Sequence, residues 1–420
     1  MIFLYRILTF FLFPIFVIIT YLRRFTDKED KIRFREKISI NESFFPKNKK
    51  VVWIHAASIG ETNSVLPLIQ EIIENNQKIF VLLTTTTLTS SQIVNKTCLN
   101  QNNFQHRFFP LDVQFLVKKF LDYWKPETII FVDSEVWPNY LLEISKRNIP
   151  LMLLNGRITT KSFKRWKIFP NLSKKIFNLY DLCLTASTES EKNLKSLGAK
   201  NVKFIGNLKF CVSASDKNDN NKLKSFFNNY FIWCAASTHR GEEEIILKTH
   251  NLLKNKIKNL LTIIIPRHIN RVEPIKEELT NLNLNIHLDE PTSSINKKTD
   301  IYIVNSYGKT KSFYNNCKNV FLGGSIINHG GQNPLEAARF GCKILHGKNV
   351  SNFTEIYDFL NKNKISHLVK SKLEFEKKLD TLLSNGNNSS KNIRHKINHI
   401  GKKILKDTQK EINFFLKNAI

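Results

Sequence analysis

The chain has 420 residues, of which 42% are hydrophobic and 11% aromatic, so it is long enough for two domains that each bury a core. This composition excludes a largely disordered protein. The formal net charge of +28 predicts attraction to polyanions, namely an anionic membrane, phosphorylated substrates or nucleic acid. No RRM, zinc-finger or basic-zipper pattern is present in the sequence, so nucleic acid is the least favoured of these partners.

Residues 1–24 are predicted to form a membrane anchor. The segment 2–21 consists almost entirely of Ile, Leu, Phe and Val, interrupted by a proline and by Arg6, and about twenty apolar residues just span a bilayer. A basic cluster that ends at Lys28 would keep the rest of the chain on the cytoplasmic side. A cleaved signal peptide is disfavoured, because no small-residue cleavage site follows. Arg6 leaves two alternatives open, a helix that crosses the membrane and a helix that lies on it.

Residues 31–212 are predicted to form a first Rossmann-like domain. The charged segment 31–50 is expected to be a juxtamembrane helix and connector. After it, apolar runs alternate with helical periodicity, for example at 64–73 and 140–145, which is typical of a parallel sheet covered by helices. The predicted strands are 51–54, 79–83, 128–132, 151–154 and 202–205.

A polar stretch at 213–228 predicts a linker. Residues 229–390 repeat the alternation and predict a second Rossmann-like domain, and residues 391–420 are expected to form a basic C-terminal helix. The predicted strands of the second domain are 231–235, 261–265, 301–304, 320–322 and 343–345. The fold class is therefore α/β, and two doubly wound domains of this kind bind ligands in the cleft between them.

The stretch from Gly323 to Glu336 contains the strongest local motif. Two glycine pairs follow an apolar strand and lead into a helix start, for which Asn333 is the expected N-cap and Pro334 the first helical residue. Backbone N–H groups in such a loop and at a helix start attract an anion. The motif predicts a phosphate or nucleotide site, and the alternative is a tight turn with a capping box.

Charged side chains follow several predicted strands of the first domain, at the sheet edge where open α/β folds carry their chemistry. Glu61, at a predicted helix start, is either a general base or only a complement to the helix dipole. Asp133 and Glu135 bring two carboxylates together, which is costly unless something uses them. Arg157 and Lys209 are cations that would offset negative charge.

In the second domain, Arg267 and Arg271 follow a predicted strand and are a candidate bidentate phosphate pair. The alternative is two surface arginines in salt bridges. The six cysteines never occur at C-x-x-C spacing, which predicts reduced thiols used in packing and no structural zinc.

Seven motifs occur in a fixed order, W-I-H-A-A-S-I-G-E, D-S-E-V-W-P-N, N-G-R, G-N-L-K-F, A-S-T-H-R-G-E-E, P-R-H-x-x-R and G-G-S-x-x-x-H-G-G-Q-N-P-L-E. With them the chain resembles the bacterial 3-deoxy-D-manno-octulosonic acid (Kdo) transferases of lipopolysaccharide synthesis, from the anchor to beyond Phe353. The resemblance implies a GT-B fold and an inverting transfer of Kdo from CMP-Kdo to the lipid A precursor, lipid IVA. It also implies a location at the inner membrane, with catalytic domains on the cytoplasmic side, and no metal ion or other cofactor.

The resemblance also implies roles for single residues. Glu61 matches the catalytic base of the family, and Asp133 and Lys209 match two transition-state stabilisers. The residues that match CMP contacts are Pro266, Arg267, Gly308, Lys309, Thr310, Asn333, Pro334, Leu335 and Glu336. The chain departs from the usual pattern at Asp133, where the family has Glu, at Gln332, where His is usual, and in segment 305–310, which lacks the usual Asp-Thr start and the Glu after Gly.

Two other functions fit parts of the sequence. One is another GT-B transferase that uses a UDP-sugar, and the residues that read the base would decide between the donors. The other is a non-enzymatic protein that binds a membrane surface through its lysines. That alternative predicts no need for Glu61 or Arg267 and leaves the motifs at the strand ends without an explanation.

Overall fold

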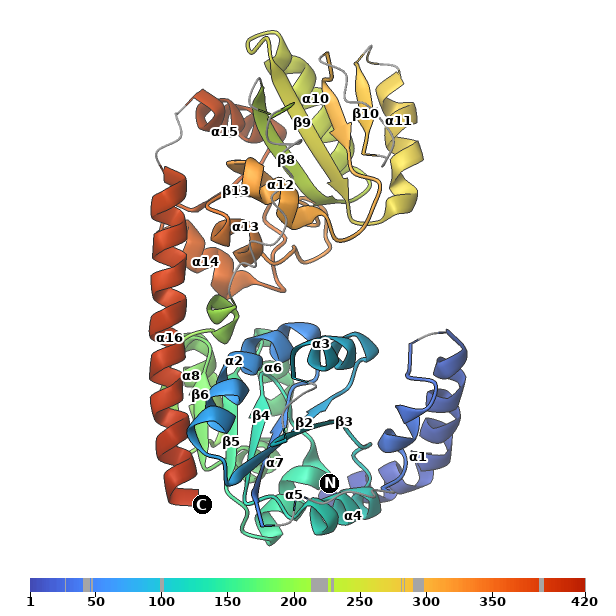
Figure 1. Cartoon of the computed structure of the whole chain (residues 1–420), viewed down its shortest axis with the longest axis vertical. Coiled ribbons are helices and arrows are strands. Elements are labelled where there is room, and N and C mark those ends of the chain that lie inside the picture. Colours follow the sequence, from blue (N-terminus) through green and yellow to red (C-terminus); the bar gives the residue numbers. More distant parts are fainter. Residues whose placement is uncertain are drawn as a thin grey trace. The chain divides into compact units, whose positions relative to one another are not determined.

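The computed structural model describes the chain except for residues 27, 41–45, 47, 99–101, 213–225, 228–229, 281, 283, 290–297, 385–388 and 420. The chain folds as two compact units, the first comprising Met1–Val212 with Ile400–Ile420 and the second Ser213–His399. Most of the linker expected at 213–228 lies outside the described residues. Each unit is built around one parallel sheet with helices packed on it (Figure 1), so the predicted α/β class is confirmed.

The sheet of the first unit has seven strands in the order β3-β2-β1-β4-β5-β6-β7. The strands are β1 (Lys50–His55), β2 (Ile79–Thr85), β3 (Phe104–Phe108), β4 (Thr128–Val132), β5 (Leu151–Gly156), β6 (Leu182–Thr185) and β7 (Val202–Phe204). The helices are α1 (Ile2–Arg23), α2 (Ile59–Asn75), α3 (Leu88–Cys98), α4 (Gln114–Trp124), α5 (Pro138–Lys146), α6 (Thr160–Lys167), α7 (Pro170–Phe177) and α8 (Thr188–Leu197). Apolar runs identify all these strands except β3, an edge strand with three polar residues, and β6, which has only four residues.

The sheet of the second unit also has seven strands, in the order β10-β11-β9-β8-β12-β13-β14. The strands are β8 (Phe231–Thr238), β9 (Leu260–Pro266), β10 (Ile286–Leu288), β11 (Ile301–Ile303), β12 (Asn319–Leu322), β13 (Lys343–His346) and β14 (Ser366–Leu368). The helices are α10 (Glu242–Lys254), α11 (Val272–Thr280), α12 (Thr310–Asn316), α13 (Leu335–Arg339), α14 (Thr354–Lys362), α15 (Lys372–Ser384) and α16 (Ser389–Ala419). The sequence pattern does not identify β10 and β14, which have three residues each and form the two sheet edges.

The predicted C-terminal helix is present as α16, which begins in the second unit and ends in the first. Its final part packs against the end of the first sheet. Lys203 of β7 forms an ion pair with Glu411 at 2.8 Å, and the Cys211 thiol donates to the carbonyl of Gly401 at 3.3 Å. These contacts join residues 208 and 190 positions apart into one unit.

The segment 31–50 does not form the expected juxtamembrane helix. Its described part contains one short 3₁₀ helix, η2 (Arg33–Lys37), before β1 begins. The reason is that Lys37 is buried, where its ammonium group donates to Glu29 at 2.5 Å and to the carbonyl of Thr86 at 2.8 Å. The connector is therefore held against the first unit instead of extending as a free helix.

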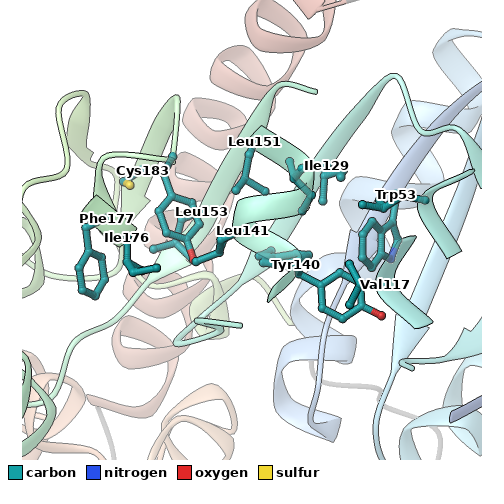
Figure 2. Packing of buried hydrophobic residues seen from close by; sticks show 14 of the residues in the cluster. Trp53, Val117, Ile129, Tyr140, Leu141, Leu151, Leu153, Ile176, Phe177 and Cys183 are labelled. Atoms are coloured by element: carbon teal, nitrogen blue, oxygen red, sulfur yellow. The ribbon is translucent and has the colours of Figure 1, made fainter. Parts of the chain in front are cut away.

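The core of the first unit lies between its sheet and helices α4, α5 and α7 (Figure 2). Trp53 of β1 is fully buried, and its ring lies 4.8 Å from Phe120 and 5.5 Å from Tyr140. Strands β1, β2 and β4 are buried along almost their whole length, because helices cover both faces of a parallel sheet. This packing holds the carboxyl ends of the strands, where the polar motifs follow, in fixed positions.

Candidate active site

Glu61 lies in the first turn of α2, directly after the carboxyl end of β1. The hydroxyl of Ser58, the N-cap residue, accepts from the backbone N–H of Glu61 and donates to its Oε1 at 2.6 Å. The other carboxylate oxygen accepts from the N–H of Ala57 at 2.7 Å. This capping box turns the carboxylate back toward the end of the sheet. The two roles considered for Glu61 are therefore compatible, since the cap also aims the side chain at the site.

Burial raises the pKa of the Glu61 carboxyl, and the nearby carboxylates of Asp133 and Glu135 add to the rise. Hydrogen bonds from the helix cap oppose it, because they favour the charged form. A carboxylate whose pKa lies above its ordinary value is a better proton acceptor near neutral pH. The local environment thus suits Glu61 to act as a general base.

Asp133 and Lys209 come together beside the first turn of α2. Asp133 follows β4 with a φ of 67°, a region that non-glycine residues rarely adopt and that is common at functional sites. The ammonium group of Lys209 lies 3.5 Å from Asp133 Oδ2, and its Cε would lie 3.7 Å from a Cβ on Gly60. The three residues expected to be catalytic are therefore neighbours in the first unit.

Two asparagines hold Lys209 in place. Lys209 lies in the 3₁₀ helix η3 (Leu208–Cys211), where Asn207 accepts from the N–H of Lys209 at 2.9 Å. Asn155, at the end of β5 with a φ of 55°, accepts from the N–H of Leu208 at 2.9 Å. The sequence motifs contain both asparagines but give no indication of this positioning role, which depends on two neighbouring strand ends.

Glu135 makes different contacts from Asp133, although only one residue separates the two in the sequence. Its Oε2 accepts from the indole of Trp137 at 2.5 Å and lies 3.4 Å from Nε2 of His55. His55 is fully buried and stacks on Phe109 with ring centroids 3.8 Å apart. Glu135 therefore supports the wall of the site, and Trp137 combines packing with this hydrogen bond.

Arg157 approaches the same strand end through its backbone. Its N–H donates to the carbonyl of Asp133 at 3.2 Å, and its carbonyl lies 2.8 Å from the hydroxyl of Ser134. These contacts fix the turn after β4, in which Asp133 adopts its unusual backbone conformation. The described contacts of Arg157 are thus structural.

In the second unit, a carboxylate of the protein itself accepts hydrogen bonds from backbone N–H groups of the glycine motif. Glu242, the first residue of α10, is fully buried and accepts from four backbone N–H groups. Three of these belong to Gly324, Ser325 and Ile326, at 2.8–3.1 Å. The N–H groups that would attract an anion at the first glycine pair therefore already bind the chain itself. A ligand anion therefore has to be held by other groups than these three N–H groups.

The first glycine pair serves close packing between strands. A Cβ on Gly323 would lie 2.3 Å from the carbonyl oxygen of Ser237, so only glycine lets β12 end this close to β8. The helix after the motif starts later than expected. Pro334 is the N-cap of α13, which has five residues, although Asn333 does accept from the N–H of Leu335 at 3.1 Å.

The remaining predicted nucleotide residues lie at the carboxyl ends of β9 and β11, two neighbouring strands of which β9 also pairs with β8. Arg267 is exposed after β9, whereas Arg271 pairs with the buried Glu243 at 3.4 Å, so the salt-bridge alternative holds for Arg271. Lys309 donates to Asp289 at 2.9 Å. Pro266, Gly308 and Thr310 occupy the same carboxyl edge of the sheet.

Histidines surround this edge, and the sequence reasoning did not assign them a role. The ring of His239 lies 4.3 Å from that of His329 and 6.2 Å from that of His268. Burial lowers the pKa of His239, and the neighbouring His329 lowers it further. A neutral imidazole both donates and accepts a hydrogen bond. His239 is therefore suited to bind a polar ligand beside Arg267.

Comparisons with known proteins agree with this arrangement. A family model described as 3-deoxy-D-manno-octulosonic-acid transferase (kdotransferase) matches residues 32–212. The 3-deoxy-D-manno-octulosonic acid transferase of Rickettsia bellii is 31% identical over 386 residues, 91% of each chain. That of Rickettsia typhi is 30% identical over 461 aligned positions, covering 99% of this chain and 98% of its own.

A solved structure shows the same fold. The UDP-GlcNAc 2-epimerase of Neisseria meningitidis bound to UDP-GlcNAc aligns with a TM-score of 0.58 at 14% identity, over 86% of this chain and all of that one. The expected GT-B fold of two Rossmann-like domains is thus confirmed. Sequence similarity over nearly the full length, together with the strand-end residues described above, places the chain in the 3-deoxy-D-manno-octulosonic acid transferase family of glycosyltransferases.

Proposed function

We propose that this Kdo transferase moves Kdo from CMP-Kdo to lipid IVA with inversion at the anomeric carbon. Glu61 takes the proton of an acceptor hydroxyl while the hydroxyl oxygen forms a bond to C2 of Kdo. The bond between C2 and the phosphate oxygen breaks in the same displacement, and CMP leaves with the electron pair. The observation that carries this proposal is the half-buried Glu61, with its raised pKa, beside Asp133 and Lys209.

Lys209 and Asp133 are proposed to stabilise the transition state. The Lys209 ammonium group would offset negative charge near the reacting carbon, and Asp133 holds it in place at 3.5 Å. Positive charge is thus proposed to come from side chains, with no resident metal ion or other cofactor.

The donor is proposed to bind at the carboxyl edge of the second sheet. The exposed Arg267 would contact the CMP phosphate, with Pro266 beside it, and Glu336 would accept from ribose hydroxyls. Segments 308–310 and 333–336 would complete the nucleotide contacts. Because Glu242 already binds the N–H groups of Gly324 and Ser325, the phosphate is assigned to Arg267 instead of that loop.

The protein is proposed to work at the cytoplasmic face of the cell inner membrane. The support is the apolar helix α1, the one helix among the described residues that is long and apolar enough to cross a membrane, and the membership of the family. The excess of basic residues suits an anionic leaflet and a phosphorylated acceptor.

The test uses the full chain purified in detergent, with CMP-Kdo generated in situ and tetraacylated lipid A precursor as acceptor. Mass spectrometry of the product should show gains of one or more Kdo units. Glu61→Gln should lower the rate roughly 10²–10⁴-fold. The control Glu127→Gln should match the wild type, because Glu127 is exposed and lies before the amino end of β4. No product from folded wild type would overturn the donor or acceptor and favour a UDP-sugar transferase. Full activity of Glu61→Gln would overturn the base.

A further inference from the structure

Helix α1 exposes an apolar face along its whole length. Large hydrophobic side chains are exposed at the i, i+3, i+4 and i+7 spacing of one helix face. They are Phe3, Leu4, Ile7, Leu8, Phe11, Ile15, Ile18, Ile19 and Leu22, and Phe10 and Tyr21 are exposed beside them. A soluble domain rarely leaves so large an apolar surface open to water, so this face is expected to be covered by a partner.

The other face of α1 is attached to the first unit by polar contacts. The Tyr5 hydroxyl donates to Asp112 Oδ2 at 2.7 Å, and Arg6 forms an ion pair with Glu143 at 3.1 Å. One turn later, Thr9 accepts from the side chain of Asn139 at 3.4 Å. Tyr5, Arg6 and Thr9 lie on one helix stripe, so the first part of α1 is docked on the domain.

The partners of this stripe are structural parts of the domain. The carboxylate of Asp112 also accepts from the backbone N–H groups of Asn139 and Tyr140, which begin α5. Glu143 is buried and also binds Arg147 at 3.0 Å. Removing α1 would take one charge-assisted or hydroxyl hydrogen bond from each of these two buried carboxylates, which is costly. The docking is therefore part of the fold of the first unit.

The far end of α1 is also attached to the same unit. Arg23 pairs with Glu29 at 3.0 Å, and Glu29 binds Lys37, which donates to the carbonyl of Thr86 after β2. Arg24 lies 5.5 Å from the centre of the ring of Phe34, which is buried. Both ends of the helix are thus fixed to one side of one folded domain.

The length of the helix leads to the same conclusion. From Thr9 to Arg23 the helix rises by about 21 Å at 1.5 Å per residue, whereas the hydrocarbon core of a bilayer is roughly 30 Å thick. The docked residues before Thr9 cannot lie in hydrocarbon while they bind Asp112 and Glu143. A transmembrane course would have to break these contacts.

We infer that α1 does not cross the membrane but lies in the plane of the bilayer surface, with its exposed face among the acyl chains and its polar stripe on the domain. Exposed cations flank the helix: Arg23 is its last residue and Lys28 follows it. Lys118 and Lys119 are exposed on α4, which contacts α1 through Phe115 and Phe13, whose ring centroids lie 5.0 Å apart. An apolar face with flanking cations fits an interface of anionic phospholipid.

The first test determines on which side the N-terminus lies. The full chain carries one protease-cleavable tag at each end and is incorporated in sealed inside-out inner-membrane vesicles. Protease added outside should remove both tags, because both ends of the helix lie on the side of the domain. Removal of the C-terminal tag with protection of the N-terminal tag until detergent is added would overturn the inference.

The second test measures binding to vesicles of phosphatidylcholine with and without phosphatidylglycerol. Phe11→Glu, on the exposed face, should weaken binding about tenfold or more and leave the melting temperature unchanged. Phe204→Glu is the matched control, since Phe204 is an exposed aromatic residue on β7, at the opposite edge of the sheet from β3. If Phe11→Glu binds vesicles as the wild type does, the exposed face of α1 does not contact the bilayer. If binding does not increase with phosphatidylglycerol, the interface is not an anionic one. Either result would contradict the inference.

Discussion

The two units place a glutamate at the same point of the fold and use it differently. Glu61 and Glu242 each lie in the first turn of the helix that follows a central strand, β1 or β8. Glu242 is fully buried and binds four N–H groups. Glu61 has only its helix cap and faces other carboxylates, which raise its pKa. The same residue type therefore fixes a loop in one unit and is suited to proton transfer in the other.

The largest expected effect comes from removing Glu242. Glu242→Ala would leave four N–H groups, two of them in buried hydrogen bonds, without their acceptor. The free energy of unfolding of the second unit should therefore fall by about 3–5 kcal/mol. Denaturant unfolding monitored by tryptophan fluorescence measures this loss. Glu61→Ala, which removes only a helix cap, should cost about 1 kcal/mol. If both variants lose the same free energy of unfolding, Glu242 has no greater structural role than Glu61.

Lys209 should matter for turnover more than for stability. Lys209→Met is expected to lower kcat/KM about 10²-fold, because it removes one preorganised positive charge from the site. Lys209→Arg should recover part of the loss. The matched control is Lys203→Met, which breaks only the exposed ion pair with Glu411. A variant at 209 with wild-type kcat/KM would remove Lys209 from the proposed mechanism.

The pH dependence of activity should report the environment of Glu61. The base must be unprotonated, so kcat/KM is expected to fall as the pH drops through the pKa of Glu61, which lies above its ordinary value of 4.5. Asp133→Asn removes a negative charge that raises this pKa. In that variant the acid limb should therefore shift to lower pH, whatever the loss in rate. If the acid limb of the kcat/KM profile does not shift in this variant, the limb reports the titration of a group other than Glu61.

The smallest effect is expected at Asn155, which positions Lys209 without touching it. Asn155→Ala removes the acceptor for the N–H of Leu208, so kcat should fall several-fold, roughly as expected for one lost hydrogen bond of about 1 kcal/mol. KM for CMP-Kdo should stay the same, because the proposed donor residues lie in the second unit. A rise in KM with unchanged kcat would argue against this positioning role.

The sequence predicts the strands that are buried on both faces, because a continuous apolar run is a strong local signal. It does not predict the edge strands β3, β10 and β14, which are short or carry polar residues. The proposed catalytic cluster could be placed because Glu61, Asp133 and Lys209 each follow a strand of one parallel sheet. Parallel strands bring such residues to one edge.

Contacts between distant segments were not predictable. The glycine motif has the local features of an anion site, yet the group that binds its N–H groups comes from Glu242, more than eighty positions earlier in the chain. The prediction of a helix at 31–50 was wrong for a similar reason, because the burial of Lys37 depends on its contacts with Glu29 and Thr86. In both cases a buried charge finds its partner through tertiary packing, which local patterns do not encode.

The attachment of α1 at both ends has a consequence for how the acceptor is found. Because α1 is joined to its domain through Tyr5, Arg6 and Arg23, no flexible linker separates the proposed membrane-bound helix from the domain. The first unit would then diffuse laterally along the leaflet at a fixed distance from it. Its encounter with a lipid acceptor would be a diffusional search in two dimensions. Turnover on vesicles should accordingly follow the surface density of the acceptor lipid and remain unchanged when the suspension is diluted with buffer that contains the same concentration of CMP-Kdo.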